Sequence, residues 1–145
     1  MTAKEYLSEY RWATIEARSL LESIEELDNR LTSTATKQAD PDAVQHSPSL
    51  RDIQADLIIK KVELEEKLIR KYKGIVETRG KIERTIETVK GGRERTLLRM
   101  RYIQGMRWED ICVAMGYEWA QTHRVHGEAL KEVEEILKGG KNDEC

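Results

Sequence analysis

The sequence predicts an all-α protein, with a long helical hairpin or coiled coil followed by a C-terminal helix-turn-helix unit. Charged residues make up 36% of the 145 residues and apolar residues 39%, and there is no Phe. This balance is typical of long helices with narrow apolar stripes. The two prolines, Pro41 and Pro48, lie in one polar stretch, so the rest of the chain can be helical. Val and Ile nowhere alternate with polar residues as they do in strands.

A first helix is expected over residues 1–31, because apolar side chains recur there every three or four positions. This stripe contains Leu7, Tyr10, Ala17, Leu21, Ile24 and Leu31. Asp28 interrupts it. Residues 32–49 are small and polar and include both prolines, so they are expected to form a flexible loop.

A second long helix is expected over residues 50–90, with Ser49 as its N-cap and a pair of glycines after its end. Its apolar stripe has close to heptad spacing, and Lys61 and Arg79 interrupt it. So long a helix with so narrow a stripe does not stay folded alone in water. It must therefore pack against the first helix or against a second chain, and both arrangements remain open. A homo-oligomer, most simply a dimer, is expected.

Residues 93–138 are expected to form a compact helical unit, followed by a disordered tail at 139–145. Three helices are predicted, at about 94–103, 108–115 and 118–138. Gly116 lies in the short turn between the second and third of these, as in a helix-turn-helix. The inward-facing residues of the last two helices are expected to be Ile111, Ala114, Met115, Thr122, Val125, Ala129 and Leu130.

The other face of the third helix carries side chains suited to contact with DNA bases. In a helix-turn-helix, the first residues of the second helix meet base edges in the major groove. Arginine can bond guanine, glutamine can bond adenine, and alanine can pack on a thymine methyl group. The residues expected to read bases are Trp119, Ala120, Gln121, His123 and Arg124.

Charge is unevenly distributed although the formal net charge is only -2. Residues 67–101 hold twelve Lys or Arg and four Glu, a net charge of +8. This basic block favours a polyanionic partner, here double-stranded DNA. Lys90, Arg93, Arg95 and Arg107 are expected to contact phosphates. The alternative is a solvated helix face whose cations pair with neighbouring glutamates.

Residues 97–130, "LLRMRYIQGMRWEDICVAMGYEWAQTHRVHGEAL", resemble region 4 of sigma-70-type factors. They are more similar still to small phage regulators of the RinA and ArpU kind, including an uncharacterised phage family of the same layout. The motifs "LRMRYIQGM", "WEDI", "MGY" and "QTHRVHG" carry this resemblance. It implies a sequence-specific DNA-binding regulator, of phage late genes, with RNA polymerase as a further partner. Glu118 departs from the pattern, which has Ser as the N-cap.

Several other functions find little support in the sequence. His123 and His126 have no third metal ligand at a suitable spacing, so no metal site is expected. No paired carboxylates or phosphate-binding loop indicate an enzyme or a cofactor. No apolar run is long enough to span a membrane, and a cytoplasmic location is expected. Two alternatives remain: a DNA-packaging factor of the small-terminase type, and a non-enzymatic adaptor that binds RNA polymerase.

Overall fold

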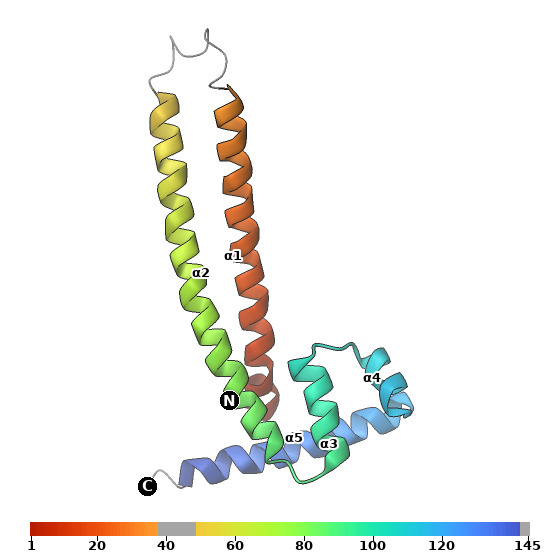
Figure 1. Cartoon of the computed structure of the whole chain (residues 1–145). Coiled ribbons are helices and arrows are strands. Elements are labelled where there is room, and N and C mark those ends of the chain that lie inside the picture. The colour runs from red at the N-terminus through yellow and green to blue at the C-terminus, as the bar shows by residue number, and fades with distance from the viewer. Residues whose placement is uncertain (38–48, 143–145) are drawn as a thin grey trace. The chain divides into compact units, whose positions relative to one another are not determined.

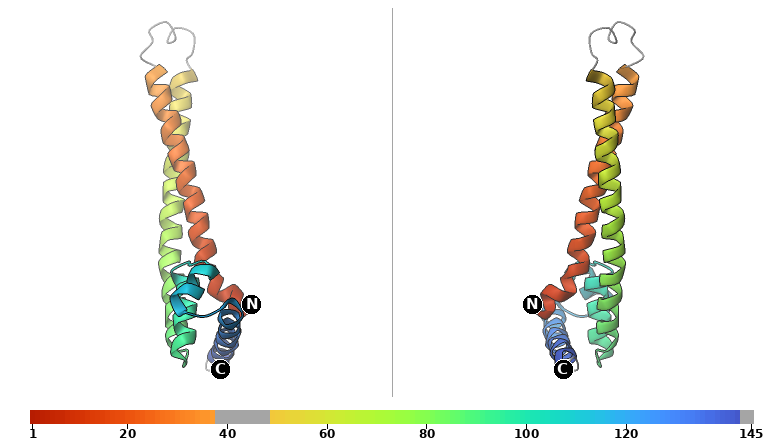
Figure 2. Two further views of the ribbon diagram at one scale, coloured as in Figure 1. Left: turned by 90° about the vertical axis from the view of Figure 1, so that its right-hand side faces the viewer. Right: turned by 90° about the vertical axis from the view of Figure 1, so that its left-hand side faces the viewer.

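The computed structural model describes residues 1–37 and 49–142, and every regular element in these ranges is a helix, which confirms the predicted all-α class. The elements are α1 (Ala3–Lys37), α2 (Ser49–Glu87), α3 (Gly92–Leu98), the π-helical turn η1 (Arg99–Ile103), α4 (Trp108–Met115) and α5 (Trp119–Asn142). Helices α1 and α2 form a hairpin within one chain (Figures 1 and 2). The long helices therefore pair with each other, which answers the question that the sequence left open.

The chain divides into two compact units. One unit, residues 15–74, contains the middle of the hairpin, and Ala17, Ile24 and Leu27 of α1 are buried in it. Asp28 interrupts the apolar stripe of α1, and Lys61 is one of the two residues that interrupt the stripe of α2. They pair with each other, since Lys61 Nζ lies 2.6 Å from Asp28 Oδ1. This contact raises the pKa of Lys61. The two interruptions are thus a matched polar contact between the helices.

Helix α1 continues beyond its expected end. Residues 32–37 were expected to begin the loop, but they extend the helix to Lys37. The Thr32 hydroxyl donates a hydrogen bond to the Asp28 carbonyl at 2.9 Å, which lets this polar residue stay within the helix. No Gly or Pro in this stretch ends the helix. The remainder of the expected loop, residues 38–48, lies outside the described residues.

Helix α2 ends at Glu87, three residues before its expected end. The amides of Thr88 and Val89 bond to carbonyls three residues earlier, and this tightens the last turn. Glycine then starts the next helix, because α3 begins at Gly92 and not near residue 94. The end of the last helix also differs from the prediction. Helix α5 includes residues 139–142 of the expected tail, and residues 143–145 lie outside the described part.

The expected helix over 94–103 has two geometries. Helix α3 ends at Leu98, and residues 99–103 form a π-helical turn. The Gln104 amide bonds to the Arg99 carbonyl at 3.0 Å, and the Met106 amide bonds to the Met100 carbonyl at 2.9 Å. Gly105, with φ of 67°, then reverses the chain before α4. Hydrophobic periodicity does not distinguish a short π-turn from an α-helix.

The second unit consists of residues 1–14 and 75–145. Its larger core is built by Ala3, Leu7, Ile82, Ile86, Val89, Leu98, Tyr102, Ala129 and Val133. A smaller core consists of Leu97, Ile111 and Val125, with Met100, Met106, Trp108, Met115 and Tyr117 packed around it. The smaller core joins α3, α4 and α5, and so it positions the segment expected to meet DNA.

Candidate nucleic-acid interface

A turn of three residues joins α4 to α5. Gly116 ends α4 in the left-handed conformation, with φ of 68° and ψ of 30°. The Tyr117 amide bonds to the Cys112 carbonyl at 3.0 Å, which satisfies a carbonyl at the helix end. A β-carbon at Gly116 would meet nothing within 4 Å, so the demand for glycine comes from backbone conformation alone. This geometry directs the chain into α5.

One face of α5 is anchored in the two cores. Thr122, Val125 and Ala129 are buried and Leu130 is partly buried, as the sequence predicts. The Thr122 hydroxyl donates to the Glu118 carbonyl at 3.0 Å and accepts a hydrogen bond from Cys112 Sγ at 3.2 Å. Thr122 thereby ties the start of α5 to α4.

The prediction for α4 is partly wrong. Ile111 is buried and Met115 packs on the smaller core, as expected, but Ala114 is exposed. In a helix of eight residues, only about one residue per turn can point into the core. Ile111 and Met115 are four positions apart and fill that line, which leaves Ala114 beside it.

The opposite face of α5 is open at its first two turns. Trp119, Ala120, Gln121 and Arg124 are exposed, and the exposed fraction of Trp119 is 54%. These four residues lie on the side of the helix that faces away from the buried Thr122 and Val125. Four of the five residues expected to read bases are therefore accessible to a ligand.

His123, the fifth of these residues, is only half-buried and lies between two tryptophans. Its ring centroid is 4.5 Å from that of Trp119 and 4.7 Å from that of Trp108. Its Nε2 atom is buried and makes no hydrogen bond within the described residues. The imidazole therefore packs against the Trp119 ring and helps to hold it in place.

The aromatic contacts continue inward through His126, whose burial the sequence did not indicate. The His126 ring lies 4.6 Å from Trp108, and its Nε2 lies 2.7 Å from the Tyr102 hydroxyl. The pKa of His126 is lowered to about 4, mainly because the ring is buried. The nearby His123, Lys4 and Arg101 also contribute to this lowering. Burial likewise raises the pKa of Tyr102 to about 12. Both groups are therefore neutral near pH 7.

Arg101 completes this cluster. Its guanidinium carbon lies 4.8 Å from the centroid of the Trp108 ring, and its Nη1 donates to the Met106 carbonyl at 2.9 Å. Burial lowers the pKa of Arg101, with Arg11 as a further cause. Although it belongs to the basic block, Arg101 holds the loop before α4 in place.

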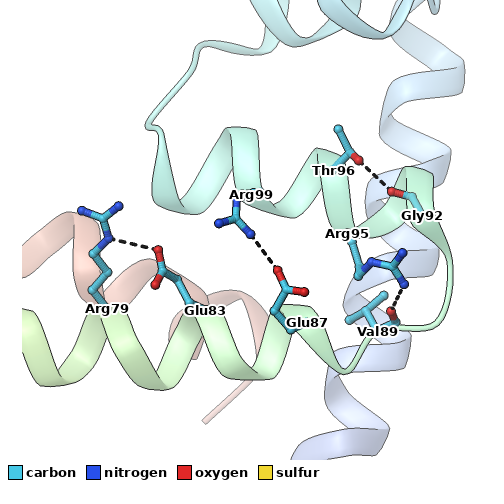
Figure 3. Close-up of polar contacts among 8 residues, drawn as sticks. All are labelled: Arg79, Glu83, Glu87, Val89, Gly92, Arg95, Thr96 and Arg99. Atoms are coloured by element: carbon cyan, nitrogen blue, oxygen red, sulfur yellow. Dashed lines mark hydrogen bonds and ion pairs between the residues drawn. The ribbon is translucent and has the colours of Figure 1, made fainter.

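The basic residues near the α2–α3 junction differ in their surroundings. Arg95 Nη1 donates to the Val89 carbonyl at 2.8 Å (Figure 3). The same atom donates to the Lys90 carbonyl at 3.0 Å. Arg93 Nε lies 2.9 Å from Glu94 Oε1, and Arg93 Nη2 lies 3.2 Å from Glu128 Oε2. Lys90 is exposed. Arg95 thus stabilises the end of α2, whereas Lys90 and Arg93 are exposed.

Other cations of the block pair with glutamates. Arg99 Nη1 lies 2.7 Å from Glu87 Oε1, and Arg79 Nε lies 3.2 Å from Glu83 Oε1 (Figure 3). Lys71 pairs with Glu16. These pairs were the expected alternative to phosphate contact. Glu83 and Glu87 are already counted in the net charge of +8, so of these three pairs only the one with Glu16 neutralises part of it. Arg107, just before α4, is exposed and lies 3.4 Å from Asp110.

Two further properties bear on the kind of site. Among residues 1–37 and 49–142, no three His, Cys, Asp or Glu side chains come together where a metal ion could bind. Within the same residues, no helix has both the length and the apolar character needed to cross a membrane.

The fold and this surface define a helical protein in which a long hairpin precedes a small unit that exposes the start of its last helix. The chain belongs to the family described as Protein of unknown function (DUF1492), which matches residues 30–134. The match includes the last part of α1, all of α2, α3, η1 and α4, and most of α5. No curated protein and no solved structure matches the chain.

Proposed function

We propose that this member of the DUF1492 family is a sequence-specific DNA-binding transcription regulator that reads the major groove with the first two turns of α5. One observation carries the proposal. The anchored face of α5 is buried through Thr122 and Val125, while Gln121 and Arg124 are exposed immediately after the turn from α4. This is the arrangement that a recognition helix requires.

Each exposed side chain has a chemistry that suits base recognition. Arg124 can donate two hydrogen bonds to guanine, and Gln121 can bond both to N6 and N7 of adenine. Ala120 offers a methyl group small enough for close approach to thymine. Trp119 supplies an apolar surface, and an exposed aromatic side chain of this size favours a contact surface. His123 contributes by supporting Trp119.

Lys90, Arg93 and Arg107 are proposed to contact phosphates. Arg93 reaches Glu128 on α5, which is four residues after Arg124 and about 6 Å further along the helix axis. A cation in this position lies within reach of the backbone of a duplex held by Arg124. The unit formed by residues 93–138 has eight basic and eight acidic side chains, so base contacts must contribute much of the specificity.

The resemblance of residues 97–130 to sigma-70 region 4, and to regulators of the RinA and ArpU kind, supports control of phage late genes as the biological role. The test is selection of bound sequences from random duplex DNA by the full chain, near physiological salt. Gln121→Ala/Arg124→Ala serves as the matched control. A shared motif that the wild type enriches and the control does not would support the proposal. Absence of any enriched motif would contradict it.

A second candidate, an adaptor that binds RNA polymerase, is favoured by one observation. Val113 on α4 is 83% exposed, so it offers an apolar side chain that a protein partner could bury. A pull-down of RNA polymerase with the full chain, with and without promoter DNA, distinguishes the two candidates. Capture without DNA that Val113→Gln abolishes would favour the adaptor.

A further inference from the structure

The first turns of α1 bring cations as well as apolar side chains to the core of the second unit. Lys4, Leu7 and Arg11 are three and four residues apart, so they lie close to one line along the helix. Leu7 is fully buried in the larger core, which also contains Tyr102 of η1 and Ala129 of α5. Lys4 and Arg11 are exposed, one turn before and one turn after Leu7. They therefore flank the place where α1 enters the core that it shares with η1 and α5.

A third cation, Arg101 of η1, lies near both of these side chains. Burial lowers the pKa of Arg101, the nearby Arg11 lowers it further, and the opposing effect of Glu109 is smaller. The pKa of His126 is lowered mainly by burial, and Lys4 and Arg101 both add to the lowering. Lys4, Arg11 and Arg101 therefore form one group of like charges, which we call the α1–η1 basic cluster.

Unlike Arg93 and Arg99, the members of the α1–η1 basic cluster are not neutralised by carboxylates. Arg93 and Arg99 lie 2.9 Å and 2.7 Å from glutamate oxygens. Within residues 1–37 and 49–142, no acidic side chain forms an ion pair with a member of the cluster. Glu5 and Glu9, the acids of the same turns, lie about 100° or more around the helix from the two cations of α1. An anion bound at the cluster would relieve the repulsion among its charges.

Arg101 links the cluster to the start of the recognition helix. Its guanidinium carbon lies 4.8 Å from the centroid of the Trp108 ring. Trp108 in turn contacts His123, which packs against Trp119 on the open face of α5. In the described part of the chain, only the Met106 carbonyl accepts a hydrogen bond from the Arg101 guanidinium, so its other N–H groups can donate to a ligand. A guanidinium held in a fixed orientation is well suited to phosphate oxygens.

We propose that the α1–η1 basic cluster binds backbone phosphates of the duplex that α5 reads, so that the start of α1 is part of the DNA-binding surface. This inference rests on the proposed function of α5. Phosphates supply the negative charge that the cluster lacks, and Lys and Arg are common donors to them. Lys90 and Arg93 lie near Glu132 and Glu128, further along α5. The two groups of cations therefore contact different phosphates.

The first test is the salt dependence of binding to the duplex that the full chain selects. Lys4→Gln/Arg11→Gln removes two exposed charges and leaves Arg101 to hold its loop. Each lost phosphate contact lowers the slope of log affinity against log salt concentration by about 0.9, so the slope should fall by about one to two. The charge-retaining Lys4→Arg/Arg11→Lys should keep the wild-type slope. Arg18→Gln/Lys60→Gln removes one exposed Arg and one exposed Lys from the other unit, and this control should also keep it.

Thermal unfolding without DNA separates a binding role from a structural one. Because the cluster repels itself, Lys4→Gln/Arg11→Gln should unfold at the wild-type temperature or slightly above it. A lower unfolding temperature, or a salt slope equal to that of the wild type, would overturn the proposal. If the wild type binds a selected duplex through Gln121 and Arg124 but the slope does not change, only this inference fails. If the wild type binds no duplex, the proposed function fails with it.

The second test locates the phosphates by ethylation interference on the selected duplex. Duplexes that are ethylated at single phosphates are divided into bound and free fractions by the wild type and by each variant. Lys4→Gln/Arg11→Gln should lose sensitivity at about one or two phosphates to which Lys90→Gln/Arg93→Gln remains sensitive. Loss of sensitivity at the same phosphates in both variants, or at none in Lys4→Gln/Arg11→Gln, would overturn the proposal.

Discussion

The Tyr102 hydroxyl and His126 Nε2 lie 2.7 Å apart, so η1 and α5 share a buried hydrogen bond. His126 lies two residues after Arg124, and both its ring face and its nitrogen are engaged by neighbours. The register of α5 is therefore held by a polar contact as well as by apolar packing. This places the exposed residues of the first two turns on a rigid base.

The first prediction concerns pH. The pKa of His126 is about 4 in the folded protein and 6.5 in the unfolded chain, so the unfolded chain binds more protons between these values. Stability is therefore full above pH 6.5 and falls as the pH decreases to about 4. The loss should be on the order of 2 to 3 kcal/mol. Urea unfolding across this pH range measures it.

Carboxylates also titrate in this range, so the comparison with a variant is decisive. His126→Gln retains a group that can bond to Tyr102 and removes the titration. Its stability should change less between pH 6.5 and 4 than that of the wild type. Identical pH profiles for His126→Gln and the wild type would contradict the assignment.

The second prediction concerns the larger core. Ile86 is 1% exposed, and Ile86→Ala should lower the free energy of unfolding by about 2 to 5 kcal/mol, because it removes apolar contacts and leaves a cavity. Val113→Ala, at a residue that is 83% exposed, should change it by less than about 0.5 kcal/mol. Thermal unfolding followed by circular dichroism gives both values. Equal effects would mean that Ile86 is not in a packed core.

The third prediction separates Arg95 from Arg93. Arg95 donates to two main-chain carbonyls at the end of α2, so Arg95→Gln should destabilise the protein by about 1 to 3 kcal/mol. Arg93 forms exposed ion pairs, and Arg93→Gln should leave unfolding nearly unchanged. Denaturant titration of the two variants decides the matter, and a larger loss for Arg93→Gln would reverse these roles.

The fourth prediction concerns salt. Each phosphate contact contributes about 0.9 to the slope of log affinity against log salt concentration. Lys90→Gln/Arg93→Gln should therefore reduce the slope by about one to two and weaken binding to all duplexes alike. Arg18→Gln/Lys60→Gln removes the same charge from the other unit and serves as the control. If both pairs change the slope equally, or neither does, the two residues are not phosphate contacts.

Much of the fold follows from local sequence patterns. The apolar stripes of the two long helices predicted that each helix packs against another, but left open whether the partner is in the same chain. The spacing of Thr122, Val125 and Ala129 predicted the anchored face of α5. What periodicity missed was the pairing of Asp28 with Lys61, because it depends on the register between helices. The sequence also placed the end of α1 too early. Thr32 is of a type common in loops, and its hydrogen bond to the Asp28 carbonyl is known only from the structure.

The candidate site was only partly predictable for a related reason. From residue type alone, Gln121, Arg124 and His123 were equally good candidates for base contact. Only the fold shows that His123 lies between Trp108 and Trp119. Arg95 likewise looked like any other cation of the basic block. Its role at the α2 end arises because Val89 and Lys90 leave carbonyls without helical partners.

The fifth prediction tests base recognition itself. It compares the affinities of the wild type, Gln121→Ala and Arg124→Ala for the selected duplex and for a scrambled duplex, at one salt concentration. Because these side chains are proposed to bond base edges, each variant should lose about 1 to 3 kcal/mol on the selected duplex and much less on the scrambled one. Equal losses on the two duplexes would contradict a base-reading role for α5.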